Sequence, residues 1–263
     1  MDPWTLILLA WAAAAAVMAV LWLVQRSTGD AGIVDVAWAF GVGATVGFFA
    51  YHLDGHPTRR VLVAVLAGIW AVRLGLYLLS RVVRLPEDGR YRRLRESWGD
   101  RVQGFFFGFF QVQAAWCVLF ALPMLIAARN RAAAPAWYDF AGVAVWLASV
   151  VGASVADRQL ARFRSDPSNR GKVCQVGLWH YSRHPNYFFE WLQWWAWVLI
   201  GWHAPLGWLT LLGPAIMLLF LLKITGIPPT EAQAIASRGD AYRQYQRTTS
   251  AFFPWPPKTA ELS

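Results

Sequence analysis

The chain is poor in the residues that build the most familiar metal and catalytic sites. Only two of its 263 residues are cysteines, Cys117 and Cys174, and five are histidines. The cysteine spacing matches no metal motif, and we expect both thiols to be reduced. His52, His56 and His203 have no carboxylate cluster at ligand spacing, so we predict no metal. The sequence also lacks a Walker loop, a Gly-x-Gly-x-x-Gly run and a credible Ser/His/Asp or Cys/His arrangement. These absences exclude the commonest nucleotide-binding and hydrolase signatures.

Acidic residues are also scarce, with 15 Asp and Glu against 24 Lys and Arg, for a net charge of +9. Hydrophobic residues make up 57% of the chain, above the roughly 45–50% of soluble domains, and 17 are tryptophans. Tryptophan favours the membrane–water interface. We therefore expect a membrane protein whose partners are the lipid bilayer and a hydrophobic small-molecule substrate. The basic excess then indicates cytoplasmic loops, or a contact with anionic lipid or a phosphate-bearing ligand, and not nucleic acid.

Long apolar segments predict the fold class. A spanning helix needs about 20 mostly apolar residues, so we expect an all-α polytopic membrane protein of about seven transmembrane helices in a single domain, 1–263. Arg26 follows the first apolar run and no basic residue precedes it, so we expect a retained span and not a signal peptide. The expected spans are 4–24, 32–52, 60–80, 104–128, 137–156, 186–202 and 206–224.

The basic residues predict the orientation. Arginines and lysines gather in 81–103, in 157–185 and in the tail 225–263, which seven spans place on one side. That side is the cytoplasm, so the N-terminus is expected outside and the C-terminus in the cytoplasm, although Arg129 and Arg131 weakly disagree.

Three cytoplasmic stretches have their own local expectations. Residues 157–164 are expected to prolong the fifth span. Residues 229–246 have near-helical spacing and predict a helix that Gly239 weakens. The closing run SAFFPWPP is expected to have no regular structure.

The most informative stretch is 177–190, GLWHYSRHPNYFFE, a basic and aromatic loop that runs into an apolar segment. Pro185 suits the first turn of a helix, where free N–H groups and the helix dipole attract an anion. Arg183 and His184 add donors beside that end. A phosphate or carboxylate ligand is therefore indicated, with anchoring to lipid phosphates as the alternative.

Asn186, Glu190 and Gln193 continue this stretch at i, i+4 and i+7, one face of a helix. We expect this polar stripe to face the interior of the helix bundle. Interhelical hydrogen bonding is the simpler explanation. We favour a functional site, because an ionisable residue one turn into a span is rare without a role.

Further candidates occur after the fifth span and in the tail. Asp157 suits a hydrogen bond to a ribose or amide and Arg164 a phosphate, whereas Arg158 and Arg162 are better explained as a solvated helix end. In the tail, tyrosines beside arginines could stack an adenine and pair its phosphate, or dock an amphipathic helix on the membrane. These tail residues are Glu231, Arg238, Tyr242 and Tyr245.

Polar residues also lie inside the earlier spans. Asp35 and Arg73 could form an ion pair, or could line a pocket together with Tyr77. Gln111 and Gln113 lie in the fourth span. The residue pattern does not decide between the two interpretations.

The run GLWHYSRHPNYFFEWLQWW, with Asp157 upstream and the tail from Tyr242 to Pro254, resembles the steroid 5-alpha-reductase superfamily. IVDVAWAFG and GFFFGFFQVQ are typical of its bacterial membrane branch. The resemblance covers most of the chain. It implies a seven-helix oxidoreductase of lipid metabolism in the bacterial inner membrane, which binds NADPH on its cytoplasmic side. It also implies reduction of a polarised C=C bond in a steroid-like or other isoprenoid substrate.

Roles follow from that resemblance. Asn186 and Glu190 match residues that hold the nicotinamide, and Asp157 and Arg164 match cofactor-contacting residues. The steroid reductases also polarise the substrate ketone with a Gln–Glu pair on an early span, which is missing here, so Tyr77 or Asp35 is the hypothetical donor. The expected catalytic residues are Tyr77, Asp35 and Glu190. The expected cofactor-binding residues are Asp157, Arg164, Tyr181, Arg183, His184, Asn186, Glu190, Arg238, Tyr242 and Tyr245.

Two other functions stay open. Isoprenylcysteine carboxyl and phospholipid methyltransferases, which use S-adenosylmethionine, also carry a Gly…Arg-His-Pro-x-Tyr stretch and a Tyr-x-x-Tyr tail. A doubled Glu in the tail would have favoured them, and only Glu231 is present. A non-catalytic lipid-binding or scaffold protein is the third interpretation. The sequence does not identify the substrate or decide between NADPH and NADH.

Overall fold

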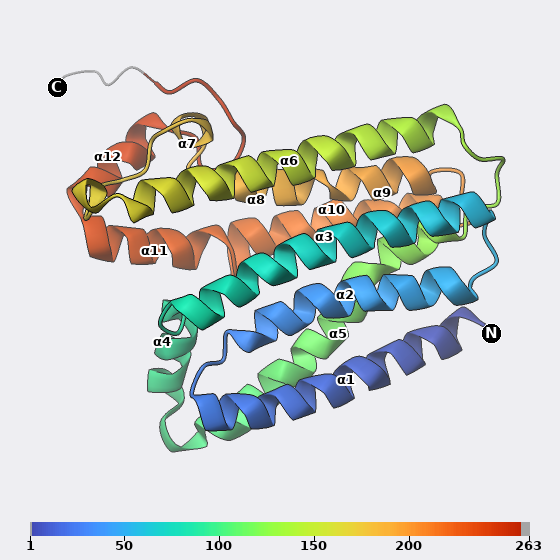
Figure 1. Ribbon diagram of the computed structural model, residues 1–263, viewed down its shortest axis with the longest axis horizontal. Coiled ribbons are helices and arrows are strands. Elements are labelled where there is room, and N and C mark those ends of the chain that lie inside the picture. The colour runs from blue at the N-terminus through green and yellow to red at the C-terminus, as the bar shows by residue number, and fades with distance from the viewer. Residues whose placement is uncertain (1, 259–263) are drawn as a thin grey trace. The chain divides into compact units, whose positions relative to one another are not determined.

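The structure is a computed structural model, which describes residues 2–258 (Figure 1). All regular structure in this range is helical, as expected. The α-helices are α1 (Pro3–Thr28), α2 (Ile33–His52), α3 (Pro57–Arg84), α4 (Gly89–Trp98), α5 (Val102–Ala128), α6 (Trp137–Ser165), α7 (Leu178–Tyr181), α8 (Pro185–Leu192), α9 (Trp194–Gly201), α10 (Leu212–Leu219), α11 (Ile227–Arg238) and α12 (Asp240–Thr248). Short 3₁₀ turns cover Gly99–Arg101, Pro167–Asn169 and Gly207–Leu211, and a π-helical turn covers Phe220–Ile224.

Six helical segments are long and apolar enough to cross a membrane, which makes this an integral multi-pass membrane protein. They are Pro3–Thr28, Ile33–His52, Pro57–Arg84, Gly89–Ala128, Trp137–Ser165 and Gly207–Arg238. The expected sixth span, 186–202, is instead two helices of eight residues, α8 and α9, which meet at Gln193. The hydrogen bond from the Gln193 amide to the Phe189 carbonyl is long at 3.4 Å, which marks the interruption. The orientation of the chain stays a prediction.

One helix was missed in the arginine-rich segment 81–103. Helix α4 begins where the Asp88 side chain accepts a hydrogen bond from the Arg90 amide, 2.9 Å away. Its sequence, GRYRRLRESW, has no apolar period, so sequence reasoning treated it as a loop.

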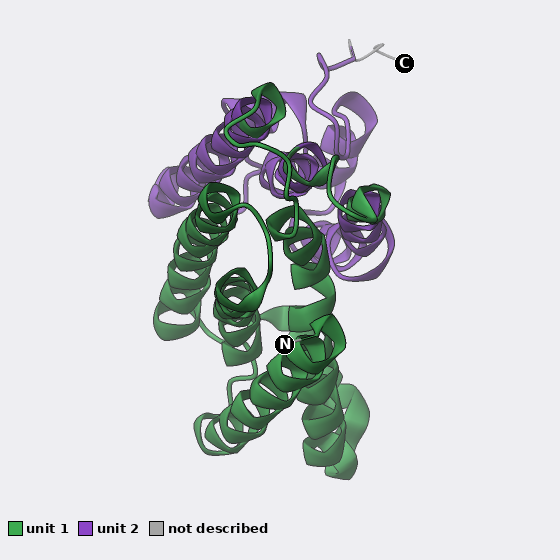
Figure 2. Ribbon diagram, turned by 90° about the vertical axis from the view of Figure 1, so that its right-hand side faces the viewer, with its two compact units in different colours: residues 1–139, 200–210 green, residues 140–199, 211–263 purple. Residues whose placement is uncertain are grey.

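The chain divides into two compact units, coloured separately in Figure 2. Unit 1 comprises 1–139 and 200–210, and unit 2 comprises 140–199 and 211–263. The division into two compact units does not test the expectation of a single domain over 1–263, which stays a prediction.

In unit 1, α2 packs against α3 and α5, and α1 packs against α5 and α2. Close approach of α2 and α3 depends on small residues, because a Cβ on Gly43 would collide with Ala71 and one on Gly75 with the Phe40 ring. Helix α4 lies against α5 at one end of these helices (Figure 1).

In unit 2, α6 extends to Ser165, so residues 157–164 prolong the fifth span as predicted. Helix α8 packs against α10, and Gly152 of α6 lets the Phe189 ring of α8 come close. The helix expected over 229–246 is broken into α11 and α12 at Gly239, whose φ of 54° is a conformation that glycine adopts most readily. Residues 250–258 have no regular structure, as expected.

Candidate functional site

The predicted site residues fall into both units. All ten predicted cofactor-binding residues lie in unit 2, on α6, on the 178–190 stretch and on α11–α12. Tyr77 and Asp35, the predicted donors to a substrate carbonyl, lie in unit 1.

Glu231 of α11 is the centre of a polar cluster in unit 2. Its Oε1 accepts hydrogen bonds from Arg183 Nε at 2.7 Å and from the Tyr242 hydroxyl at 3.4 Å. His184 Nε2 lies 3.2 Å from the same oxygen, and Gln246 Nε2 donates to Oε2 at 2.7 Å. Both partners of the Arg183–Glu231 ion pair are largely buried. The cluster therefore joins the start of α8 to both tail helices.

Backbone contacts complete this connection between the loop and the tail. Arg183 Nη1 donates to the carbonyls of Gln246 and Thr249, at 3.0 and 2.6 Å. The Ser182 hydroxyl donates to the Phe252 carbonyl at 2.9 Å, and the Tyr245 hydroxyl donates to the carbonyls of Trp179 and Ser182. We call this set of contacts the tail clasp. Four predicted cofactor ligands, Arg183, His184, Tyr242 and Tyr245, direct polar atoms into it.

Burial controls the ionisation of the clasp. Burial lowers the pKa of His184, although the hydrogen bond to Glu231 acts in the opposite direction. Burial raises the pKa of Tyr242 and of Tyr245, and the Glu231 charge adds to the effect at Tyr242. Near neutral pH the histidine is therefore neutral, and both tyrosines keep their protons.

The polar stripe on α8 begins with an amide–carboxylate contact. Asn186 Nδ2 donates to Asp157 Oδ1 of α6 at 3.2 Å, which joins two residues that the sequence offered as separate candidates. Asn186 Oδ1 is buried and has no hydrogen-bond partner within residues 2–258. The same is true of both amide atoms of Gln193, whose exposed fraction is 1%. Glu190 lies between the two on the same helix and is half-buried.

Three predicted cofactor ligands, Tyr181, Arg164 and Arg238, take no part in the tail clasp or the polar stripe. Tyr181 is exposed, and Arg238 Nε donates to the Lys172 carbonyl at 3.0 Å. Arg164 lies in the last turn of α6, where it is exposed. On the same helix, Arg158 and Arg162 border a surface hollow of about 260 Å³ with Val155 and Gln159.

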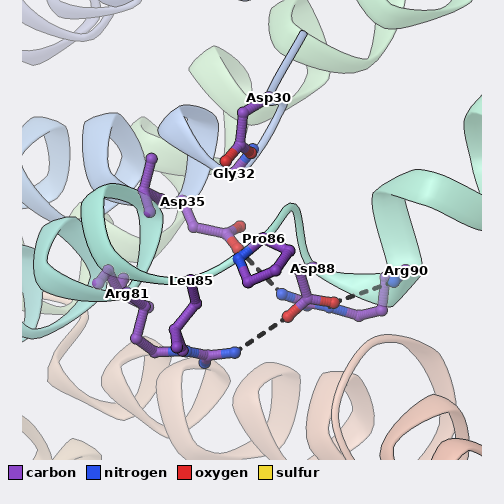
Figure 3. A pocket seen from close by; sticks show the side chains of 10 residues that line it. Asp30, Gly32, Asp35, Arg81, Leu85, Pro86, Asp88 and Arg90 are labelled. Atoms are coloured by element: carbon purple, nitrogen blue, oxygen red, sulfur yellow. Dashed lines mark hydrogen bonds and ion pairs between the residues drawn. The ribbon is translucent and has the colours of Figure 1, made fainter. Parts of the chain in front are cut away.

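Asp35 belongs to an ion network at a small pocket of unit 1 (Figure 3). Its Oδ2 accepts from Arg90 Nη2 at 3.0 Å, and its Oδ1 accepts from the Tyr91 hydroxyl at 2.7 Å. Arg90 also donates to Asp88, which in turn accepts from Arg81 Nη2 at 3.1 Å. Burial acts to raise the pKa of Asp88, but the charges of Arg90 and Arg81 and the hydrogen bonds from Arg90 together outweigh it, so the net shift is downward. Both Asp35 oxygens thus accept hydrogen bonds from residues of α4.

Sequence reasoning missed the centres of both networks. Glu231 was grouped with the tail tyrosines, but nothing in its spacing predicted a contact with Arg183, 48 positions away. Nothing in the sequence indicated that Gln246 would contact Glu231. Arg90 and Tyr91 were counted only as part of a cytoplasmic loop, because α4 itself was not predicted.

Comparison with known proteins agrees with the membrane architecture. The model of a family described as a protein of unknown function, DUF1295, matches residues 21–249, and this family belongs to the steroid 5-alpha reductase-like clan. The chain is also similar to an uncharacterized protein of Schizosaccharomyces pombe, at 27% identity over 89% of this chain and 76% of that protein. No solved structure matches the chain.

Proposed function

The chain belongs to the DUF1295 family of membrane proteins, and from this premise we propose that it is an NADPH-dependent reductase of a polarised C=C bond in a steroid-like or other isoprenoid lipid. The observation that supports this proposal is the Asp157–Asn186 pair, in which the Asn186 amide nitrogen is held by Asp157 and the amide oxygen is buried without a partner among residues 2–258. Buried polar atoms are nearly always hydrogen-bonded, so an unpaired one indicates a missing ligand atom.

The unpaired atom fits a nicotinamide. A carboxamide offers N–H donors, and Asn186 Oδ1 can accept one of them. Asp157 accepts from Asn186 Nδ2 and so fixes which end of the Asn186 amide faces the ligand. NADPH, when bound, supplies a hydride. Glu190, one turn farther along α8, completes the polar side of this site.

The other predicted ligands divide into two groups in this proposal. Arg164 and Tyr181 are exposed and Arg238 is half-buried, so all three can reach a ligand from solvent and suit the phosphates and the adenine. Arg183, His184, Tyr242 and Tyr245 act through the tail clasp, which holds the start of α8 in place. The roles of Tyr77 and Asp35 as carbonyl-side donors stay predictions.

A thermal-shift titration of the detergent-purified protein tests the proposal. A ligand that binds only the folded state raises stability, by about 2.7 kcal/mol at a hundredfold excess over its Kd. We expect NADPH to raise the Tm of the wild type and of Gln233→Ala, an exposed amide control on α11. In Asn186→Ala the NADPH shift should be lost. A shift with S-adenosylmethionine alone would instead establish the methyltransferase alternative, and an unchanged NADPH shift in Asn186→Ala would refute the nicotinamide assignment.

A further inference from the structure

Two buried donors on α8–α9 have no acceptor within the described chain. Gln193 is 1% exposed and Trp197 is 0% exposed, and neither the Gln193 amide nor Trp197 Nε1 has a hydrogen-bond partner among residues 2–258. Two other indoles in unit 2 are satisfied: Trp191 Nε1 donates to the Pro214 carbonyl at 3.0 Å, and Trp179 Nε1 to the Ala156 carbonyl at 2.9 Å. Trp146 Nε1 is also buried without a partner among residues 2–258, but no second unpaired donor accompanies it on its helix, α6. An unpaired buried polar group costs free energy, so two of them on one helical face call for a functional explanation.

The two donors lie on the same face. Gln193 and Trp197 are four residues apart, and the Ala196 amide donates to the Gln193 carbonyl at 3.0 Å, so the turn between them is helical. Side chains at this spacing are neighbours, with Cβ atoms about 5–6 Å apart. Gln193 is also seven residues beyond Asn186, about 10 Å farther along the helix axis. The pair therefore lies about two helical turns beyond the amide proposed to hold the nicotinamide, toward Gly201.

We propose that Gln193 Nε2 and Trp197 Nε1 together bind the conjugated carbonyl oxygen of the substrate. This inference rests on the proposed reductase function and adds the residues that recognise the substrate. A two-donor site among apolar residues selects an apolar molecule with an acceptor oxygen such as a carbonyl, and the neighbouring C=C bond follows from the proposed reductase function.

The electron balance shows that negative charge develops on the carbonyl oxygen, where the two donors lie in this proposal. A hydride forms a new C–H bond at the β-carbon, and the C=C electron pair moves to join the α-carbon to the carbonyl carbon. The carbonyl π pair then moves to oxygen, where both N–H groups donate to the enolate. Water or an acid protonates the α-carbon, so the substrate gains a hydride and a proton while the nicotinamide is oxidised. Donors held in a water-poor site stabilise this developing charge more than water does.

The ligand-free protein gives a first test, which needs no turnover. Gln193→Met keeps the size of the side chain and removes the unpaired amide, so its Tm should rise by about 2–4 °C. Asn130→Leu is the control, because the Asn130 amide is buried but donates to the Ile200 carbonyl at 2.9 Å. That variant should lose stability. A fall in Tm for Gln193→Met would mean that the amide is already satisfied, and would overturn the proposal.

Ligand binding gives the second test. The probe is a steroid enone with ¹³C at its conjugated carbonyl, bound to the purified full chain with NADP⁺ to prevent turnover. Isotope-edited infrared spectra should show the carbonyl band at lower frequency than in detergent micelles. Gln193→Met and Trp197→Phe should each weaken binding about 3–10-fold and return the band toward its micelle position. Trp191→Phe, whose indole is already paired in the wild type, should leave the band unchanged.

The outcomes separate this inference from the reductase proposal. The thermal shift with NADPH should persist in Gln193→Met and Trp197→Phe, because neither residue holds the cofactor. No binding of the probe, or a band and a Kd unchanged in both variants, would overturn the carbonyl assignment while the NADPH shift still supported a reductase. Loss of the NADPH shift in the wild type, with the probe response intact, would refute the reductase and leave a carbonyl-binding site.

Discussion

Removing Asp139 should destabilise the protein more than removing any exposed carboxylate. Arg59, at the start of α3, is 0% exposed, and its Nε and Nη2 donate to the two oxygens of Asp139 at 2.8 and 2.7 Å. The guanidinium also donates to the backbone carbonyls of Asn130, Ala132 and Ala133, at 3.1, 2.8 and 3.3 Å. Both charges are thus withdrawn from water and satisfied by each other, by the loop 130–136 and, for Arg59, by the Tyr138 hydroxyl.

The magnitude follows from that geometry. Breaking a buried pair leaves an uncompensated charge and costs about 3–5 kcal/mol. At about 2–4 °C per kcal/mol for a chain of this size, Asp139→Ala should lower the Tm by roughly 6–20 °C. The matched control is Asp54→Ala, because Asp54 Oδ2 lies 3.8 Å from Arg131 Nη2 and the two side chains are 89% and 71% exposed, respectively. That exposed pair should contribute less than about 1 kcal/mol.

Thermal unfolding of both variants in the same detergent is the assay. A double variant, Arg59→Met with Asp139→Leu, should recover much of the loss, because it removes both charges and keeps apolar volume. Equal Tm values for Asp139→Ala and Asp54→Ala would refute the reasoning that the buried Arg59 charge needs Asp139 to compensate it.

Three further predictions concern unit 2. As the pH is lowered from 7.5 through 6.5, the ordinary pKa of histidine, the unfolding free energy should fall, because the unfolded state then binds more protons than the folded state. The fall should level off below the lowered pKa of His184 in the folded protein. His184→Gln should flatten this step in denaturant titrations. Glu231→Gln should cost about 2 kcal/mol in the same titrations, because Arg183 loses its charged acceptor, and a cost no larger than that of the exposed Gln233→Ala would contradict the clasp. Gly239→Ala should cost about 1–3 kcal/mol because φ is 54°, whereas Gly104→Ala, in helix α5, should be neutral or stabilising by calorimetry.

Much of the fold was predictable because a membrane helix needs only length and apolar content. The five earlier spans and the last apolar segment lie in helices where they were expected. The exceptions are local. Helix α4 depends on a cap at Asp88 and on contacts with Asp35, and the interruption at Gln193 depends on one weakened backbone bond. Neither feature changes the hydropathy of the sequence, so hydropathy does not predict it.

The candidate site was predictable as a set of residues but not as a set of contacts. Asp157 and Asn186 were both proposed, and their hydrogen bond spans 29 positions that sequence spacing cannot relate. The clasp was less visible still, because Glu231 and Arg183 meet only after the chain has folded back on itself. Periodicity reports which face of one helix is polar, but not which residue of another helix that face meets.

The tail clasp also fixes when the loop before α8 reaches its final shape. The Arg183 amide donates to the Ser250 carbonyl, and the Trp255 amide donates to the Tyr181 carbonyl, each at 2.9 Å. These partners follow the loop residues by 67 and 74 positions in the chain. The loop before α8 therefore cannot make these contacts until residues 250–255 have been synthesised. A chain that stops before residue 250 would still carry all six candidate spans, but the start of α8 would lack its anchor.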